Sequence, residues 1–246
     1  MDRMLYIAMS GAKQTMQAQI VNAQNLANAN TTGFREDLQA FVSRPVTGDG
    51  LPSRVYNTAY GIGANLAPGT IKTTGNDLDV AIQGEGWIAV QADDGTEAYT
   101  RAGDLRIDSA GLLKTGSGHP VLGNGGPIAV PPAETLEIGV DGTISIRPVG
   151  QAPNTLAVVD RIKLVNPPAK GLTKGPDGLM RLAGGVDSPP DAGVTLVSDA
   201  LELSNVNPLD SMVSMMDLAR HFELQIKMMQ IAKENDEASA QLITVR

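Results

Sequence analysis

Few side chains in this sequence have the type and spacing that catalysis requires. The two histidines are His119, in a glycine-rich stretch, and His221, on an expected helix, and neither has a second histidine at the spacing of a metal site. Gly84-Glu85-Gly86 is a single GxG motif between two expected strands, and no helix follows that could bind phosphate. We interpret the histidines as a turn residue and a helix-surface residue, and the GxG motif as a hairpin turn.

The acidic residues give an equally weak signal. Asp93-Asp94 and Asp77-x-Asp79 resemble fragments of calcium-binding loops, but the remaining oxygen ligands are missing. The chain has 27 acidic residues, so two carboxylates could still face one cleft, as they do in glycosidases. None of them stands in a recognisable catalytic motif. We expect no enzyme activity, no catalytic residue, no metal site and no cofactor.

Composition excludes several kinds of partner. The chain has no cysteine, which excludes disulfides and thiolate metal sites. Its net charge of −8 disfavours nucleic acid, which needs a basic face, and also anionic lipid. There is no run of eighteen apolar residues, so we expect no membrane insertion. No secretory signal peptide is visible, which fits either a cytoplasmic protein or export that leaves the N-terminus intact.

Amide side chains and methionines are the remaining candidates. Asn22, Asn25, Asn28 and Asn30 recur at the end of an expected helix, although asparagine is a poor helix former. They could form a solvated face, or a polar seam that fixes the register of two helices. The methionines near the C-terminus could likewise be helix core or a binding face. The sequence alone leaves both questions open.

The elements that must position these side chains are two terminal helices. Between Asn207 and about Val245 the only proline is Pro208, and there is no glycine. Apolar residues recur there in steps of three and four, which predicts a helix that packs lengthwise against another. This first set is Met212, Met215, Ala219, Phe222, Ile226 and Met229. A second apolar set lies on roughly the opposite face and predicts that a second partner covers this face. It consists of Val213, Met216, Leu224, Met228 and Ile231.

The N-terminus supplies the partner helix within the chain. Residues in steps of four and three form its expected seam: Leu5, Met9, Ala12, Met16, Gln19, Ala23 and Leu26. Asp2 can cap the start of this helix, and Gly33 suits a left-handed turn beyond its end. We expect the two terminal helices to pair.

The middle of the chain predicts short strands. All but two of the 27 glycines and all but one of the 15 prolines lie between residues 42 and 200. Strands are expected on both sides of Gly84-Glu85-Gly86 and on both sides of the Asp141-Gly142 turn, with residues 156–165 as the longest candidate. No long helix separates these strands, so a parallel sheet is not expected.

The expected fold class is therefore α+β. Long N- and C-terminal helices pair as a coiled-coil-like hairpin, and an antiparallel β-rich domain is inserted between them. The expected parts are an N-terminal helix in 1–34, an extended and poorly regular connector in 35–74, a β-rich domain in 75–200 and a C-terminal helix in 201–246.

Three motifs resemble the family of rod and hook axial proteins of the bacterial flagellum. Residues 25–34, NLANANTTGF, resemble the NNLANxxTxGF signature, with Gln24 in place of the first asparagine. Residues 201–207, LELSNVN, resemble the LExSNVN signature, and Arg220-His221-Phe222-Glu223 matches the R-x-[F/Y]-E motif that follows. In the centre, residues 84–90 are similar to the GxGFFxV hairpin and residues 99–103 to the YTRxG segment.

Within this family, the chain resembles the proximal-rod member, because Trp87 stands in place of the usual phenylalanine pair. Residues 127–131 and the length of 246 agree with this resemblance. The distal-rod relative is the alternative. The resemblance implies a structural subunit that assembles helically with other rod proteins into the drive shaft for motility. It also implies export by the flagellar type III apparatus without a cleaved signal, and a place in the basal-body rod in the periplasmic space.

The resemblance and the helix patterns together predict an assembly interface. We expect it to include Leu5, Met9, Met16, Asn25, Asn28, Gly33, Phe34, Asn205, Asn207, Met212, Met215, Arg220, Phe222, Glu223, Ile226 and Met229. Arg220 and Glu223 are expected to make polar contacts between subunits. Two other classes of function stay open at this stage: a β-rich hydrolase of cell-wall glycan, and a cytoplasmic adaptor that binds client helices.

Overall fold

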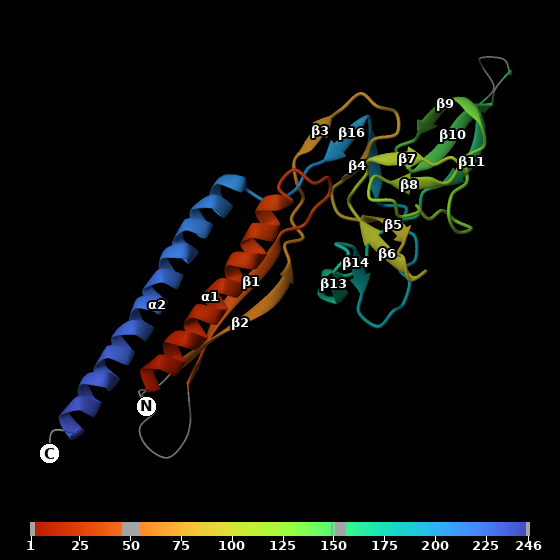
Figure 1. Ribbon diagram of the computed structural model, residues 1–246. Helices are drawn as coiled ribbons and strands as arrows, with labels where there is room; N and C mark the ends of the chain where they lie inside the picture. The colour runs from red at the N-terminus through yellow and green to blue at the C-terminus, as the bar shows by residue number, and fades with distance from the viewer. Residues whose placement is uncertain (1–2, 46–54, 149, 151–155, 245–246) are drawn as a thin grey trace. The chain divides into compact units, whose positions relative to one another are not determined.

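The computed structural model describes residues 3–45, 55–148, 150 and 156–244, and it divides into two compact units (Figure 1). The first unit contains Met1–Ala27, Asp37–Gly63 and Val206–Arg246, and the second contains Asn28–Glu36 and Ala64–Asn205. Both units are discontinuous in sequence, because the chain passes between them four times.

Two antiparallel helices, α1 (Arg3–Ala27) and α2 (Pro208–Thr244), lie side by side in the first unit (Figure 1). The expected pair of terminal helices is confirmed. Asn207 begins α2, because its Oδ1 accepts a hydrogen bond from the Leu209 N–H at 3.0 Å and Pro208 occupies the first helical position. The proposed cap at Asp2 lies outside the described residues. Within the described residues, neither helix is long and apolar enough to cross a membrane.

The seam of α1 differs from the expected one. Its buried residues are small: Ala8, Gly11, Ala12, Thr15, Ala18 and Asn25. Met9 and Met16, which the periodicity placed in the seam, are 53% and 54% exposed, and Leu5 is exposed as well. The prediction was wrong because two apolar patterns overlap on α1, and the small residues let the helices approach closely while the larger residues face outward.

The seam of α2 agrees better with its pattern. Apart from Ala219 of the expected set, which is half-buried as well, the less exposed residues follow alternating steps of four and three: Ser211, Met215, Leu218, Phe222, Gln225, Met229 and Ala232. Two of them contact α1, since the Asn22 amide donates to the Ser211 carbonyl at 2.7 Å and the Gln225 side chain lies against Gly11. Met212 and Ile226 from the expected set are exposed instead.

A β-hairpin completes the first unit. Strands β1 (Asp37–Pro45) and β2 (Val55–Ala64) pair with each other, and β1 packs along α1 (Figure 1). The expectation of a poorly regular connector was therefore wrong in this region. Its glycines and prolines suggested an irregular path, but strand-favouring residues such as Val55, Tyr56 and Thr58 sustain a strand despite Gly61 and Gly63.

The second unit is built from short strands. Its elements are β3 (Ile71–Thr73), β4 (Val80–Gln83), β5 (Trp87–Gln91), β6 (Glu97–Thr100), β7 (Leu105–Ile107), β8 (Leu113–Thr115), β9 (Ala133–Ile138), β10 (Thr143–Pro148), β11 (Ala157–Arg161), β12 (Leu164–Val165), η1 (Ala169–Gly171), β13 (Leu172–Lys174), β14 (Met180–Leu182), β15 (Thr195–Ser198) and β16 (Ala200–Glu202). The described strands form a five-stranded sheet in the order β12-β5-β6-β14-β13, a three-stranded sheet β11-β10-β9, and the pairs β15-β4, β16-β3 and β7-β8. Each pairing given between these strands is antiparallel.

Strand β5 separates two hydrophobic clusters. Ile88 and Val90 belong to a large aliphatic cluster, whereas Trp87 and Ala89 belong to a smaller one that also holds Tyr99. Successive side chains of a strand point to opposite faces, so β5 contributes to both cores. This explains why residues 87–90 read as a continuous apolar run rather than as an alternating strand.

Two strand predictions were wrong in detail. β4 and β5 flank Gly84-Glu85-Gly86 as expected, but β4 pairs with β15 and β5 pairs with β6 and β12, so the GxG is not a hairpin turn. The long strand expected in 156–165 is divided at residues 162–163 between β11 and β12, which belong to different sheets. The Asp141-Gly142 turn between β9 and β10 is confirmed, with Gly142 at a φ of 85°.

Candidate functional site

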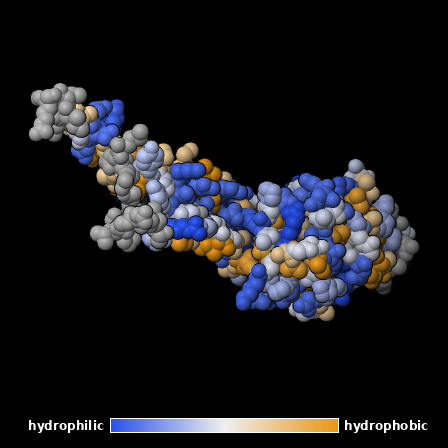
Figure 2. Space-filling view, turned by 90° about the horizontal axis from the view of Figure 1, so that it is seen from below, coloured by the Kyte–Doolittle hydropathy of each residue, from blue (hydrophilic) through white to orange (hydrophobic). Residues whose placement is uncertain are grey.

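The helix pair exposes apolar residues on faces away from its own seam. On α1 these are Leu5, Met9, Met16 and Ile20, which lie about a third of a turn from the small buried residues at about 100° per residue. Figure 2 shows such apolar residues among polar ones at the surface of the unit that carries the helices. We call this set the α1 stripe.

A second exposed face runs along α2, opposite its seam. It comprises Leu209, Met212, Val213, Met216, Leu224 and Ile231, and we call it the α2 stripe. Exposed Ile226 and Met228 flank it. Met215, Phe222 and Met229 face the seam instead, so this part of the predicted interface is covered within the chain. Contiguous apolar surface of this kind is typical of protein–protein contacts.

Charged residues interrupt the α2 stripe. Arg220 and Glu223 are exposed there, and the contact of Arg220 with Asp217 is a long 4.0 Å between two well-exposed side chains. Such a surface pair contributes little stability within the subunit. The expected contact of Arg220 and Glu223 with a neighbouring subunit stays a prediction.

A hollow of about 360 Å³ opens between the two helices and the hairpin of the first unit. Ile7, Gly11, Phe41 and Met228 are among its lining residues, and His221 lies at it as well. The lining holds no carboxylate and no second histidine. His221 is thus an exposed helix residue beside an apolar hollow, as its sequence context predicted.

Three asparagines at or just beyond the C-terminal end of α1 make hydrogen bonds within the chain and so do more than form a solvated face. Asn25 is buried, and its amide both donates to the Asp37 carbonyl and accepts from the Asp37 N–H, each at 2.9 Å. Asn22 bonds the backbone of α2 at Ser211, and Asn28 accepts from the Thr31 hydroxyl at 3.0 Å. The polar-seam alternative is therefore confirmed for Asn22. Contacts of Asn25 and Asn28 with a neighbouring subunit stay predictions.

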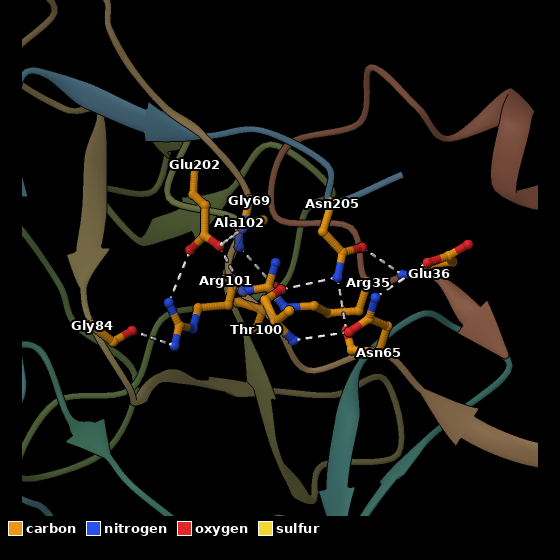
Figure 3. A network of polar contacts seen from close by, with 11 residues as sticks. Arg35, Glu36, Asn65, Gly69, Gly84, Thr100, Arg101, Ala102, Glu202 and Asn205 are labelled. Atoms are coloured by element: carbon orange, nitrogen blue, oxygen red, sulfur yellow. Dashed lines mark hydrogen bonds and ion pairs between the residues drawn. The ribbon is translucent and has the colours of Figure 1, made fainter. Parts of the chain in front are cut away.

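In the second unit, four residues that are far apart in sequence meet in one buried cluster, and Figure 3 shows three of them, Arg35, Arg101 and Glu202. The Glu202 carboxylate accepts hydrogen bonds from Arg35 Nη2 at 2.6 Å and from Arg101 Nη1 at 2.9 Å. Both guanidinium groups lie over the Trp87 ring, with Cζ 5.6 Å and 5.3 Å from its centroid. Arg35 directly follows the N-terminal signature, and the other three residues come from the YTRxG segment, the GxG segment and the C-terminal signature. We call the four residues the buried junction.

Burial makes the charges of this junction interdependent. The side chains of Arg35, Arg101 and Glu202 are 2%, 4% and 1% exposed. Burial lowers the pKa of the Arg101 guanidinium, and the nearby Glu202 carboxylate opposes that shift. Trp87 adds cation–π attraction to both arginines. A single carboxylate thus balances two buried cations, so its loss should be costly.

Backbone contacts join three chain segments around this cluster (Figure 3). Asn205 Oδ1 accepts from the Glu36 N–H at 2.8 Å, and its Nδ2 donates to the carbonyls of Asn65 and Ala67 at 2.8 and 2.9 Å. The Gly69 N–H donates to Glu202 Oε1 at 2.7 Å. Asn205 thereby links separate chain segments within the unit. Its expected contact with another subunit stays a prediction.

Gly33 is required where the N-terminal signature docks. Its φ is +66°, as expected for a left-handed turn, and a Cβ at this position would collide with the backbone of Arg101 and Ala102. Its N–H donates to the Glu202 carbonyl at 2.8 Å. The following Phe34 ring lies 3.9 Å from Lys174 Nζ, which also donates to the Arg35 carbonyl at 2.7 Å. A side chain at residue 33 would displace the segment that carries Arg35.

Sequence reasoning recognised the motifs but did not predict that they meet. Arg35 and Lys174 were not singled out, and Glu202 was quoted only as a letter of its motif. The available signal was a charged residue inside otherwise apolar or small segments, since a buried charge needs a partner of opposite sign. Nothing in the sequence specified which arginine would pair with which carboxylate.

Two acidic side chains lie side by side in a groove of the second unit. Asp79 and Asp104 form a β-bridge and line a groove of about 620 Å³. Burial raises the pKa of the Asp104 carboxyl, with backbone hydrogen bonds opposing the shift. Asp79 accepts from the Asn76 amide at 3.0 Å, and the Gly116 N–H bonds Asp104. These carboxyl groups already hold their own loops together.

Three sequence families match separate parts of the chain. "Flagella basal body rod protein" matches residues 5–35, "Flagellar hook protein FlgE/F/G D1 domain" matches residues 81–146, and "Flagellar basal body rod FlgEFG protein C-terminal" matches residues 197–242. The first and third matches cover most of α1 and α2. The second covers β5–β9 and most of β10.

Full-length relatives agree with these matches. The chain is 43% identical to the flagellar basal-body rod protein FlgF of Salmonella typhimurium and 42% identical to that of Escherichia coli, with the whole of each chain covered. It is 33% identical to the flagellar basal-body rod protein FlgG of Bacillus subtilis, again over the whole of both chains.

Proposed function

This chain belongs to the family of flagellar basal-body rod proteins, and we propose that it builds the proximal part of the rod by stacking helically with other rod subunits through the α1 and α2 stripes. The observation that carries the proposal is the outward placement of large apolar residues on both helices, away from their common seam. Burying such side chains against neighbours gains about 1.5–3 kcal/mol for each one fully covered.

The geometry of the stripes supports an open assembly. The α1 stripe and the α2 stripe use different residues, so one subunit can offer one stripe to a neighbour on each side. Contacts between unlike surfaces generate helical arrays when their rotation does not close a ring. The higher full-length identity to FlgF than to FlgG supports the proximal rod over the distal rod.

A charged residue introduced into the α1 stripe tests whether this stripe is an assembly interface. Met16→Asp should leave the monomer folded, because residue 16 is exposed, yet it should abolish incorporation into the rod and swimming. Gln17→Asp is the matched control, since it puts the same charge on the next residue, which is exposed but outside the stripe. Rods are counted by electron microscopy of basal bodies. Normal swimming of the Met16→Asp strain would refute the proposed interface.

The charged residues of the α2 stripe offer an independent test. Reversal of Arg220 or Glu223, as Arg220→Glu or Glu223→Lys, should weaken incorporation without unfolding the second unit. If Arg220 of one subunit pairs with Glu223 of the next, the double reversal should recover part of the lost incorporation. Unchanged incorporation in both single variants would remove these residues from the interface.

The proposal includes the route by which the subunit reaches the rod. Family membership supports export by the flagellar type III apparatus and a final position in the periplasmic part of the rod. The measurement is the mass of the chain in purified basal bodies. A mass that begins at residue 1 or 2 agrees with export without cleavage, and loss of fifteen or more residues contradicts it.

The proposed role is structural rather than catalytic. The groove with Asp79 and Asp104 favours a glycan hydrolase as the second candidate, because two carboxylates share it. Both carboxyl groups are occupied by hydrogen bonds within the fold, which supports a structural use. Incubation of the purified chain with peptidoglycan separates the two candidates. Release of soluble fragments that Asp104→Asn abolishes would establish the hydrolase.

A further inference from the structure

Methionine is the oxidisable residue of the proposed interface. The chain has no cysteine, and all but one of its ten methionines lie in or next to the terminal helices. Of the methionines that the structure describes, four are at least half exposed: Met9, Met16, Met212 and Met216 at 53%, 54%, 50% and 55%. The exception is Met180 of the second unit, which is 2% exposed in the smaller hydrophobic cluster.

These four methionines lie on the two stripes, not in the seam. Met9 and Met16 share a face of α1 with Leu5 and Ile20, and Met212 and Met216 share a face of α2 with Leu209 and Val213. Met215 and Met229 are partly covered against α1. The most exposed of the described thioethers are therefore the ones that assembly would cover.

We propose that Met9, Met16, Met212 and Met216 are a site of reversible oxidative modification, at which peroxide converts the free subunit into a form that cannot enter the rod. In each event the methionine sulfur takes one oxygen atom from hydrogen peroxide, the peroxide is reduced to water, and the thioether becomes a sulfoxide. Methionine sulfoxide reductases reverse the change at the expense of a thiol reductant. This inference rests on the proposed assembly function.

The physical consequence differs between the two states of the subunit. A sulfoxide is polar and accepts hydrogen bonds, so burying it in an apolar contact without a donor is unfavourable. In the free subunit the oxidised side chains stay in water and cost little. Assembly therefore selects reduced subunits and then shields their methionines. Leucine or isoleucine at these four positions would fill the same apolar role without this sensitivity.

The first experiment measures oxidation in the purified full-length chain. It is exposed to graded hydrogen peroxide, and sulfoxide is quantified at each methionine by peptide mass spectrometry. Met9, Met16, Met212 and Met216 should oxidise first, Met215 and Met229 more slowly, and Met180 at least about tenfold more slowly than the first four. Equal rates at Met180 and at the four stripe methionines would overturn the proposal.

The second experiment follows incorporation in cells treated with hydrogen peroxide. Basal bodies and the unassembled pool are purified, and sulfoxide at the four methionines is compared between them. The unassembled chain should carry at least about fivefold more sulfoxide at these positions than newly assembled chain, because susceptibility follows exposure. Equal sulfoxide content in both pools of the unaltered chain would overturn the proposal.

Variants link the modification to assembly. For each chain, incorporation after peroxide is divided by its own incorporation without peroxide, so a changed basal level does not enter. The ratio should rise when Met9, Met16, Met212 and Met216 are all replaced by leucine, and should stay at the parent value in the matched control Met180→Leu. An unchanged ratio in the fourfold variant would overturn the proposal. Failure of the untreated parent to incorporate at all would instead refute the proposed function.

Discussion

At the scale of single residues, Glu202 decides the stability of the buried junction. It is the partner carboxylate of both Arg35 and Arg101 and also accepts from the Gly69 N–H. Glu202→Gln leaves two buried guanidinium groups without a counter-charge, and breaking such a pair costs about 3–5 kcal/mol. We expect urea unfolding of the second unit to show a loss of that size at neutral pH.

The control for this prediction is the same chemical change in a solvated pair. Glu134 Oε2 lies 3.2 Å from Arg147 Nε, and both side chains are partly exposed. Glu134→Gln should change the free energy of unfolding by less than about 1 kcal/mol. Equal effects of the two substitutions would show that burial of Glu202 is not what makes it important.

Tyr99 makes the stability of the second unit depend on pH in the alkaline range. Burial raises the pKa of the Tyr99 phenol from 10.0 to about 12, although a hydrogen bond from the Ser188 N–H opposes the shift. Because the folded pKa is raised, the stabilising contribution of the neutral phenol is complete below pH 10 and is lost as the pH rises towards 12. Tyr99→Phe cannot ionise and should flatten the fall in unfolding free energy across that range.

The measurement compares urea unfolding of the parent and of Tyr99→Phe below pH 10 and in the window between 10 and about 12. Below pH 10 the variant should be less stable by about 0.5–1.5 kcal/mol, because the Ser188 N–H loses its acceptor. The difference should narrow at higher pH. A constant difference across the whole range would mean that folding does not shift the pKa of the Tyr99 phenol.

At the scale of elements, the close approach of α1 and α2 depends on Gly11. A Cβ there would lie 2.9 Å from the Gln225 side chain, which is flexible enough to give way to a single methyl group. Gly11→Leu adds a branched side chain to this contact and should cost about 1–3 kcal/mol through overpacking. We expect lower helical content by far-ultraviolet circular dichroism and a lower melting temperature of the helices.

Two matched variants test whether packing is the cause. Gly11→Ala should be close to neutral, since better helix propensity offsets the displacement of Gln225. Lys13→Leu adds the same side chain at an exposed position of the same helix and should change stability by less than about 0.5 kcal/mol. If Lys13→Leu is as harmful as Gly11→Leu, the seam is not where the cost arises.

The two helices were predicted from the sequence, but the residues at their contact were only partly predicted. Periodic apolar segments with few helix breakers predicted both helices, and the Asn207-Pro208 start of α2 can be recognised as a cap followed by a proline. The seam of α1 was misassigned because large apolar residues dominate any periodicity, whereas the true seam uses Ala8, Gly11 and Thr15. A pattern reports which side chains avoid water, but it does not report whether the cover comes from the same chain.

Strand pairing was the least predictable part for a similar reason. Adjacent strands β4 and β5 looked like a hairpin, but each finds its partner far along the chain, at β15 and at β6 and β12. The buried junction has the same character, since Glu202 lies 167 residues from Arg35. Local signals determine turns and element types, whereas long-range partners depend on the three-dimensional packing of the whole unit.

At the scale of the whole molecule, the two units differ in how much of their apolar surface they cover alone. The second unit buries large aliphatic side chains such as Ile88, Leu113 and Ile144 completely. The first unit buries mainly small residues between its helices and leaves the α1 and α2 stripes in water. Beyond Ala232, every residue of α2 up to Gln241 is exposed. A helix pair with so little apolar burial is marginal, because tertiary packing supplies most helical stability.

We therefore expect the purified monomer to combine a firmly folded second unit with helices that open readily. Hydrogen exchange on dilute, proven monomer should be much faster at residues 5–25 and 210–240 than at β5 (Trp87–Gln91), whose backbone lies between two buried clusters. Because the proposed assembly covers the stripes, the same helix residues should become as slow as β5 in assembled basal bodies. Lysozyme-treated, intact basal bodies and monomer are compared at one pH and temperature. Helices as protected as β5 in the monomer would show that the pair is self-sufficient and that assembly does not complete its folding.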